Sequence, residues 1–196
     1  MPRNNMDQEL PPNIERQFLL CMPEQSGKTR KMINKIMDTL IPSFEGSSSE
    51  LNLIFCANSI LITNQTHNRV QNTLEFSKIV NDRKILHLSS SKKANISDIY
   101  EAYFYITDIN NKVCGITMCA NIVRWNHTEE LINRLSKDID AGRVNINRIN
   151  TWIDESDKYD HIVQKVMEKQ NECPYLYLYK MTATPFSKIQ DSHVNV

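Results

Sequence analysis

Residues 18–37 read FLLCMPEQSGKTRKMINKIM, which is an apolar run, a polar loop and a helical pattern in direct succession. The run at 18–22 is short and apolar and ends at Pro23, as is typical of a buried strand. The residues from 28 to 40 place apolar side chains at helical spacing. A buried strand followed by a loop and a helix is the first half of a β-α-β unit, so this stretch predicts an α/β fold.

The same alternation of apolar runs and helical patterns continues along the chain. The apolar runs lack the period of two of a half-exposed strand, which indicates strands buried on both faces of a parallel sheet. We therefore predict an α/β domain over residues 15–186, with a mostly parallel central sheet flanked by helices and with polar segments at 1–14 and 187–196. The further strands are expected at 51–57, 85–88, 113–120, 149–153 and 175–181. The further helices are expected at 64–80, 97–105, 128–139 (with Thr128 as N-cap) and 160–169.

Composition excludes several classes of protein. The 196 residues carry 23 basic and 23 acidic side chains, which argues against a polybasic nucleic-acid-binding protein but not against a local polar groove. No run of about 18 apolar residues exists, and the N-terminus lacks an apolar signal-peptide core, so we expect an intracellular protein without a membrane span. The five cysteines include no CxxC pair, so we expect reduced thiols and no zinc site.

The end of the first predicted strand is where a ligand of a parallel α/β sheet is expected to bind. Gly27-Lys28-Thr29 supplies the second half of the phosphate-binding pattern GxxxxGK[ST] there. Such a loop directs backbone N–H groups and a lysine at phosphates, and its hydroxyl holds Mg²⁺. Met22 stands in place of the first glycine, so a chance occurrence of the tripeptide is the alternative. The chain has only four glycines, and Gly27 is the one with an expected role.

Two later strands also end in residues that suit phosphate chemistry. The fifth predicted strand delivers Asp154, which would hold Mg²⁺ through water, and Glu155, which would orient and deprotonate an attacking water. A solvated acidic turn that caps the next helix is the alternative. The sixth predicted strand ends in TATP at 182–185, which either links the acids to a moving neighbour or simply ends the strand at a proline turn.

Taken together, these three segments resemble motifs I, II and III of superfamily-two helicases in order and spacing. Residues 154–157, DESD, resemble the DExD box, and residues 182–184, TAT, resemble the Ser-Ala-Thr motif with threonine in place of serine. Glu24 and Gln25 depart from the Thr-Gly that motif I usually has. The resemblance covers residues 15–186 and implies a RecA-like P-loop three-layer sandwich, ATP and Mg²⁺ as cofactors, and hydrolysis of ATP.

The resemblance also implies roles for individual residues. Lys28 grips the β- and γ-phosphates, Thr29 and Asp154 hold Mg²⁺, and Glu155 positions the water. Thr182 and Thr184 couple the state of the nucleotide to movement of the lobes. The loop that binds ATP comprises Glu24, Gln25, Ser26, Gly27, Lys28, Thr29 and Arg30.

Two further strand ends fall where motifs Ia and Ib of the helicases lie. The resemblance implies that these segments hold the backbone of a nucleic acid, whereas ordinary helix capping is the alternative for three of the residues, Asn58, Ser59 and Asn121. The implied contact residues are Asn58, Ser59, Gln65, Asn121 and Arg124. The TATPF segment is most similar to large viral, phage or restriction-type DNA helicases, which favours DNA over RNA and, for a viral protein, the host cytoplasm or the virion.

Helicases of this superfamily have two RecA-like lobes, and the second supplies an arginine finger worth about 10³–10⁵ in rate in related systems. We expect the chain to be the first lobe, to bind ATP and Mg²⁺, and to hydrolyse ATP weakly without a second lobe from the same or another chain. Two alternatives stay open. One is a P-loop NTPase that is not a motor, and the other is a degenerate helicase lobe that serves as a scaffold.

Overall fold

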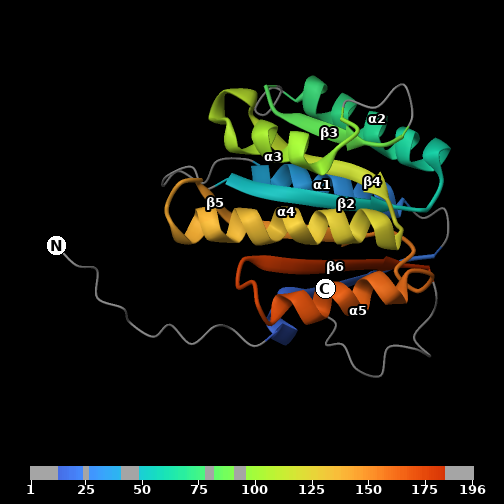
Figure 1. The fold of residues 1–196 in the computed structure, drawn as a ribbon. Helices are drawn as coiled ribbons and strands as arrows, with labels where there is room; N and C mark the ends of the chain where they lie inside the picture. Colours follow the sequence, from blue (N-terminus) through green and yellow to red (C-terminus); the bar gives the residue numbers. More distant parts are fainter. Residues whose placement is uncertain (1–12, 24–26, 41–48, 78–81, 91–95, 184–196) are drawn as a thin grey trace.

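The computed structural model describes residues 13–23, 27–40, 49–77, 82–90 and 96–183 (Figure 1). These residues form one six-stranded sheet with helices between successive strands. The strands are β1 (Gln17–Cys21), β2 (Ser49–Cys56), β3 (Lys84–Leu88), β4 (Val113–Cys119), β5 (Ile146–Ile153) and β6 (Leu176–Thr182). The helices are α1 (Lys28–Leu40), α2 (Ile60–Phe76), α3 (Ile99–Thr107), α4 (Ile122–Asp140) and α5 (Asp160–Gln170), with short 3₁₀ helices η1 (Asn13–Arg16) and η2 (Ile109–Asn111).

The sheet has the strand order β1-β6-β5-β2-β4-β3, and every pairing is parallel. All six predicted strands are present, so the predicted parallel α/β architecture is confirmed. The strand order places β6 between β1 and β5, although β1 and β6 lie at opposite ends of the described sequence. The predicted polar segments at 1–14 and 187–196 lie almost entirely outside the described residues.

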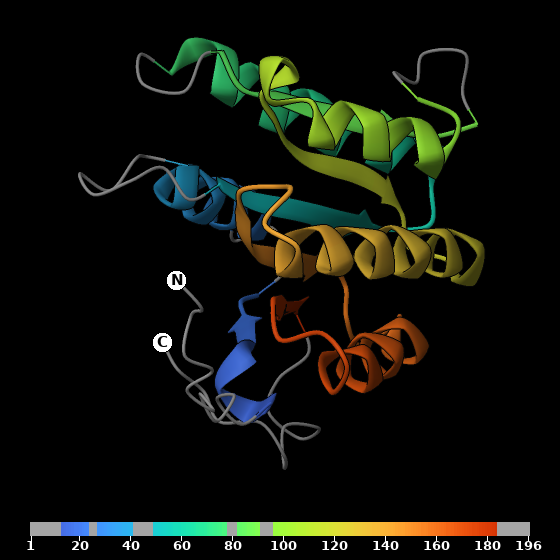
Figure 2. The same cartoon turned by 60° about the vertical axis from the view of Figure 1, so that its left-hand side comes forward.

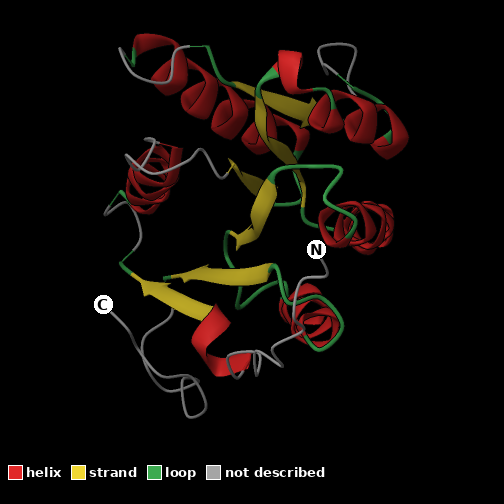
Figure 3. Ribbon diagram, turned by 90° about the vertical axis from the view of Figure 1, so that its left-hand side faces the viewer, coloured by secondary structure: helices red, strands yellow, loops and turns green. Residues whose placement is uncertain are grey.

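The helices cover both faces of the sheet and make it the middle layer of three (Figure 3). The chain crosses the sheet in one direction from β1 to β3 and returns in the other direction to β6. Because parallel crossovers are right-handed, the outgoing helices α1 and α2 lie on one face and the returning helices α3, α4 and α5 on the other. Figures 1 and 2 show α4 and α5 together on that second face. Among the described residues, no helix has both the length and the apolar character to cross a bilayer.

Two helices begin earlier than the sequence predicts. Helix α4 starts at Ile122 with Asn121 as its N-cap, so the prediction of Thr128 as N-cap is wrong. Thr128 is buried inside the helix, where its hydroxyl donates to the carbonyl of Arg124 at 2.7 Å. Helix α2 likewise starts at Ile60 rather than 64. The first turns of both helices expose apolar side chains, so the usual pattern of apolar residues facing the core does not mark these starts.

Arg16 fastens the entry of β1 to the end of α5. Its side chain is buried, and its guanidinium donates to the carbonyls of Gln170 at 2.9 Å and Cys173 at 2.8 Å. These carbonyls lie at and just after the C-terminus of α5, where a positive charge is favourable. In return, the Gln170 amide donates to the carbonyl of Arg16 at 3.0 Å. The contact closes one end of the sheet around β1 and β6.

Gly115 has no role in the sequence-based prediction, but the structure requires a glycine there. It pairs with Asn52 where β4 lies beside β2. A Cβ atom on Gly115 would lie 2.5 Å from the carbonyl oxygen of Asn52, which is backbone and cannot rotate away. The Asn52 side chain is itself buried and accepts a hydrogen bond from the indole N–H of Trp152 at 2.9 Å. The close approach of two central strands therefore depends on this glycine.

Replacing Gly115 with alanine should lower the free energy of unfolding by about 2–3 kcal/mol, because the added methyl group forces two central strands apart. Urea denaturation of the purified chain measures the change. Gly142→Ala is the control: Gly142 has φ of +66° but open space around its Cβ position, so only backbone strain of about 1 kcal/mol is expected. Equal losses in the two variants would contradict the steric explanation.

Two histidines stack between α2 and β3. The rings of His67 and His87 lie 4.8 Å apart at an interplanar angle of 16°. Nδ1 of His67 is 3.1 Å from the hydroxyl of Thr117, so the two groups share a hydrogen bond. Burial and the neighbouring His87 lower the pKa of His67 to about 4, and burial also lowers the pKa of His87. The two rings therefore bind protons less readily in the folded chain than in the unfolded chain.

Acid should destabilise the chain through this histidine pair. The pKa of His67 falls from 6.5 to about 4 on folding. The contribution of neutral His67 to the free energy of unfolding is therefore fully present above pH 6.5, and it is lost as the pH falls towards 4. Allowing for partial solvent screening, the loss is on the order of 2 kcal/mol. Thermal melts between pH 7.5 and 4.5 should show a shallower decline for His67→Gln than for the wild type. The same change at the exposed His127 is the control, and an equally shallow decline there would contradict the assignment.

Candidate functional site

The predicted motifs I, II and III come together at the carboxyl ends of β1, β5 and β6. β6 lies directly between the other two strands, so the three segments are neighbours in space. Cys21 of β1 is in register with Thr182 of β6, and the N–H of Met22 donates to the carbonyl of Thr182 at 3.1 Å. Ligands of open parallel sheets bind at such strand ends. Of the predicted residues, Glu24, Gln25, Ser26 and Thr184 lie outside the described part of the chain.

Gly27 occupies the start of α1 in a conformation that favours glycine. Its φ is +93°, and its carbonyl accepts the N–H of Lys31 at 3.0 Å, the first hydrogen bond of the helix. Nothing lies within 4 Å of a Cβ built on Gly27, so the backbone rather than crowding requires glycine. The first turn contains Lys28, Thr29 and Arg30 and no acidic residue. Its N–H groups and the helix dipole therefore favour an anion at this end.

Asp154 follows β5 and is only partly exposed to solvent. Its N–H donates to the carbonyl of Phe55 at 3.0 Å, and its carboxylate accepts the N–H of Glu155 at 3.0 Å. Burial raises the pKa of Asp154, while the N–H of Glu155 and the charge of Lys28 lower it. Lys28 and Asp154, predicted from motifs far apart in the sequence, thus lie within electrostatic reach of each other. A partly buried carboxylate within electrostatic reach of a lysine suits a site for a metal and a phosphate group.

Glu155 has an unusual backbone conformation for a residue other than glycine. Its φ is +52°, in the left-handed region that costs such residues on the order of 1 kcal/mol. Its carboxylate is 3.0 Å from the ammonium of Lys158, and its carbonyl accepts the N–H of the same lysine at 2.8 Å. The ion pair is exposed and contributes little stability, so a ligand can displace it at little cost.

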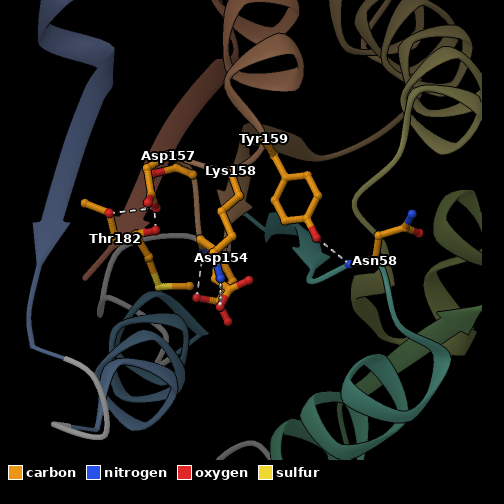
Figure 4. Close-up of polar contacts among 9 residues, drawn as sticks. Asn58, Asp154, Asp157, Lys158, Tyr159 and Thr182 are labelled. Atoms are coloured by element: carbon orange, nitrogen blue, oxygen red, sulfur yellow. Dashed lines mark hydrogen bonds and ion pairs between the residues drawn. The ribbon is translucent and has the colours of Figure 1, made fainter. Parts of the chain in front are cut away.

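The rest of the acidic loop is bound to β6. Ser156 is buried, and both its N–H and its hydroxyl donate to the carbonyl of Met181, at 2.8 and 3.1 Å. The hydroxyl of Thr182 donates to the carboxylate of Asp157 at 2.8 Å (Figure 4). Thr182, predicted as a coupling residue, therefore contacts the acidic segment directly. Asp157 was not among the predicted site residues, although it belongs to the DESD segment.

A second set of contacts extends from the acidic loop to β2. The N–H of Asn58, two residues after β2, donates to the hydroxyl of Tyr159 at 2.7 Å, on the far side of Asp154 from Thr182 (Figure 4). Tyr159 is absent from the sequence-based prediction. No motif includes it, and only the pairing of β5 with β2 brings its ring to Asn58.

The residues predicted to contact nucleic acid gather at the ends of β2 and β4. The amide of Asn121 donates to the side-chain oxygen of Asn58 at 3.2 Å. Helix capping is confirmed for two residues: Ser59 accepts the N–H of Ile62 at 3.5 Å, and Asn121 accepts the N–H of Arg124 at 3.0 Å. Asn58 is not the N-cap of either helix, and it is exposed. Gln65 is also exposed, on the second turn of α2.

The residues at the ends of β1, β5 and β6 have the chemistry that ATP and Mg²⁺ require. The described residues contain no cluster of three or more histidine, cysteine or acidic side chains able to hold a metal. Mg²⁺ bound with a nucleotide does not need one, because phosphate oxygens and waters fill most of its coordination sites. Thr29 and Asp154 would supply the protein contacts. These residues would contact the phosphate end of a nucleotide.

Comparison with other proteins adds no identification. No known protein family matches the chain, and no curated protein is significantly similar to it. The site is therefore defined by its own geometry and by the motif resemblance.

The apo protein should become more stable when Asp154 is replaced by asparagine. Burial raises the pKa of Asp154. At pH values above the ordinary pKa of a carboxyl group, ionisation of Asp154 therefore lowers the free energy of unfolding. Thermal denaturation at pH 7 without ligand should give a higher midpoint for Asp154→Asn. Asp138 has the opposite pKa shift, because hydrogen bonds from Tyr103 and Arg143 lower its pKa. Ionisation of Asp138 therefore stabilises the folded chain. Asp138→Asn should therefore lower the midpoint, and a fall in both variants would contradict the assignment.

Proposed function

We propose that the chain is the first ATP-binding lobe of an ATP-driven helicase or translocase that acts on nucleic acid, with DNA favoured over RNA. The observation that carries the proposal is the convergence of three separate sequence motifs at one edge of the sheet. Lys28 lies within electrostatic reach of Asp154, and Thr182 is hydrogen-bonded to Asp157. A chance Gly-Lys-Thr tripeptide or an ordinary acidic turn gives no reason for these contacts.

In this proposal, the chain's own residues divide the work of ATP hydrolysis. The first turn of α1 and Lys28 hold the phosphates, and Thr29 and Asp154 hold Mg²⁺. Glu155 leaves Lys158 and orients the attacking water as a general base. A second RecA-like lobe supplies the remaining charge stabilisation, so hydrolysis by this lobe alone is weak.

The proposed path of the nucleic acid follows the ends of β2 and β4. Asn58 and Asn121 are joined there, and the first turns of α2 and α4 contain no acidic residue. Backbone N–H groups at helix N-termini bind phosphates without reading sequence. The exposed side chains of these turns are aliphatic, including Leu61 and Val123. In this proposal, the phosphates of the nucleic acid are therefore bound by N–H groups at the helix N-termini rather than by lysines.

Replacing Lys28 with alanine should abolish binding of Mg²⁺-ATP. At a ligand concentration of about 100 times Kd, binding stabilises the native wild-type chain by about 2.7 kcal/mol. For a chain of this length the melting midpoint should rise by about 5–10 °C. Lys28→Ala should show almost no rise, because the β- and γ-phosphates lose their cationic partner.

Lys31→Ala is the matched control, since Lys31 is an exposed lysine one turn further along α1. It should keep the full thermal shift. A wild-type chain without any shift would support the alternative of a degenerate scaffold. A shift without any effect of single-stranded DNA on ATPase turnover, after addition of the second lobe, would support an NTPase that is not a motor.

A further inference from the structure

Tyr159 occupies a position where its side chain does not serve the helix that it precedes. It is the N-cap of α5, and its side chain makes no capping hydrogen bond. Serine, threonine, aspartate and asparagine are favoured at N-caps and stabilise a helix by about 1 kcal/mol relative to residues that cannot cap. The first turn of α5 relies instead on Asp160 and on the carbonyl of Tyr159, which accepts the N–H of Ile162 at 2.9 Å.

The hydroxyl of Tyr159 bonds to a different strand. The N–H of Asn58 donates to it at 2.7 Å, the shortest hydrogen bond between the acidic loop and the end of β2. The Tyr159 ring packs against the core on the α4 and α5 face of the sheet. Packing limits the movement of the ring relative to α5. A displacement of the acidic loop therefore changes the distance between Tyr159 and Asn58.

Tyr159 joins two sets of hydrogen bonds along the carboxyl edge of the sheet through the short loop that it shares with Asp157. Thr182 donates to Asp157 at 2.8 Å, and Asp157 and Tyr159 lie two residues apart in the same short loop. From Tyr159 the series passes to Asn58 and then to Asn121, whose side chain caps α4. The series thus joins the proposed nucleotide site to the proposed nucleic-acid path. Among the described residues of this series, the Tyr159 hydroxyl makes the one hydrogen bond that passes from the loop after β5 to the segment after β2.

We propose that Tyr159 is a positioning residue that couples nucleotide binding at the acidic loop to nucleic-acid binding at Asn58 and Asn121. This inference rests on the proposed function and adds a residue that no motif identifies. When Mg²⁺-ATP binds at Asp154 and Glu155, the acidic loop and Tyr159 move together. The hydrogen bond from the N–H of Asn58 to the Tyr159 hydroxyl then shifts the backbone at Asn58. Because binding linkage is reciprocal, nucleic acid bound at Asn58 affects the acidic loop by the same factor.

The test compares Tyr159→Phe with the wild type, because phenylalanine keeps the ring and removes only the hydroxyl. The probe is a fluorescein-labelled single-stranded oligothymidylate, titrated with the chain in the presence and absence of Mg²⁺ and a non-hydrolysable ATP analogue. The wild-type affinity for the oligonucleotide should change by at least about fivefold on addition of the analogue. In Tyr159→Phe this factor should fall close to one, while the chain still binds each ligand.

Tyr175→Phe is the matched control. The hydroxyl of Tyr175 donates to Asp140 at 2.6 Å near the opposite, amino end of the sheet. The control also loses one side-chain hydrogen bond, so it reproduces a general loss of stability. It should retain the wild-type coupling factor.

A second measurement needs no ligand. Hydrogen exchange of the Asn58 amide should be faster in Tyr159→Phe than in the wild type, because its acceptor is gone. Unchanged exchange, or an unchanged coupling factor in Tyr159→Phe, would overturn the inference and leave the proposed function intact. Wild-type binding of both ligands without coupling would also overturn only the inference. A wild-type chain that binds neither ligand would overturn both.

Discussion

The insertion of β6 between β1 and β5 is the constraint on which the rest of the structure depends. It places the end of β1, with Gly27 and Lys28 after it, one strand away from the end of β5 and its acidic loop. Both neighbours are then fastened to β6 by hydrogen bonds, the first through Met22 and the second through Ser156. Without this order, the three motifs would be short polar segments at unrelated places on the surface.

The candidate site holds features that oppose stability. Glu155 adopts a left-handed backbone conformation, and Asp154 is a carboxyl group whose raised pKa reflects partial burial. Such features persist where the surrounding structure fixes them, and they concentrate at functional sites. Here the bonds of Ser156 to Met181 and of Thr182 to Asp157 hold the loop from the β6 side. The loop is thus strained at its first acids and hydrogen-bonded to β6 just after them.

The sequence predicts the strands well because each is an apolar run between polar turns. The phosphate-binding role of Gly27, Lys28 and Thr29 stays a prediction, which rests on their position after one of these runs. The starts of helices are harder to predict, because the exposed aliphatic residues at the beginning of α2 and α4 give no amphipathic signal. The prediction of Thr128 as an N-cap is wrong for this reason. Gly115 and Tyr159 could not be predicted, because their roles depend on which strands are adjacent. Strand order is a property of the whole sheet, and no local pattern around either residue encodes it.

The pairing of β1 with β6 also bears on how the site forms during synthesis. β1 is an edge strand whose hydrogen-bonded neighbour is the last strand of the described chain, and Arg16 adds contacts with the end of α5. Contacts between such distant parts of a sequence form late, because closing a long loop costs entropy before the contact repays it. The end of β1, although made early on the ribosome, therefore acquires its hydrogen-bonded neighbour only after β6 has been made. The candidate site is in this sense a property of the completed sheet.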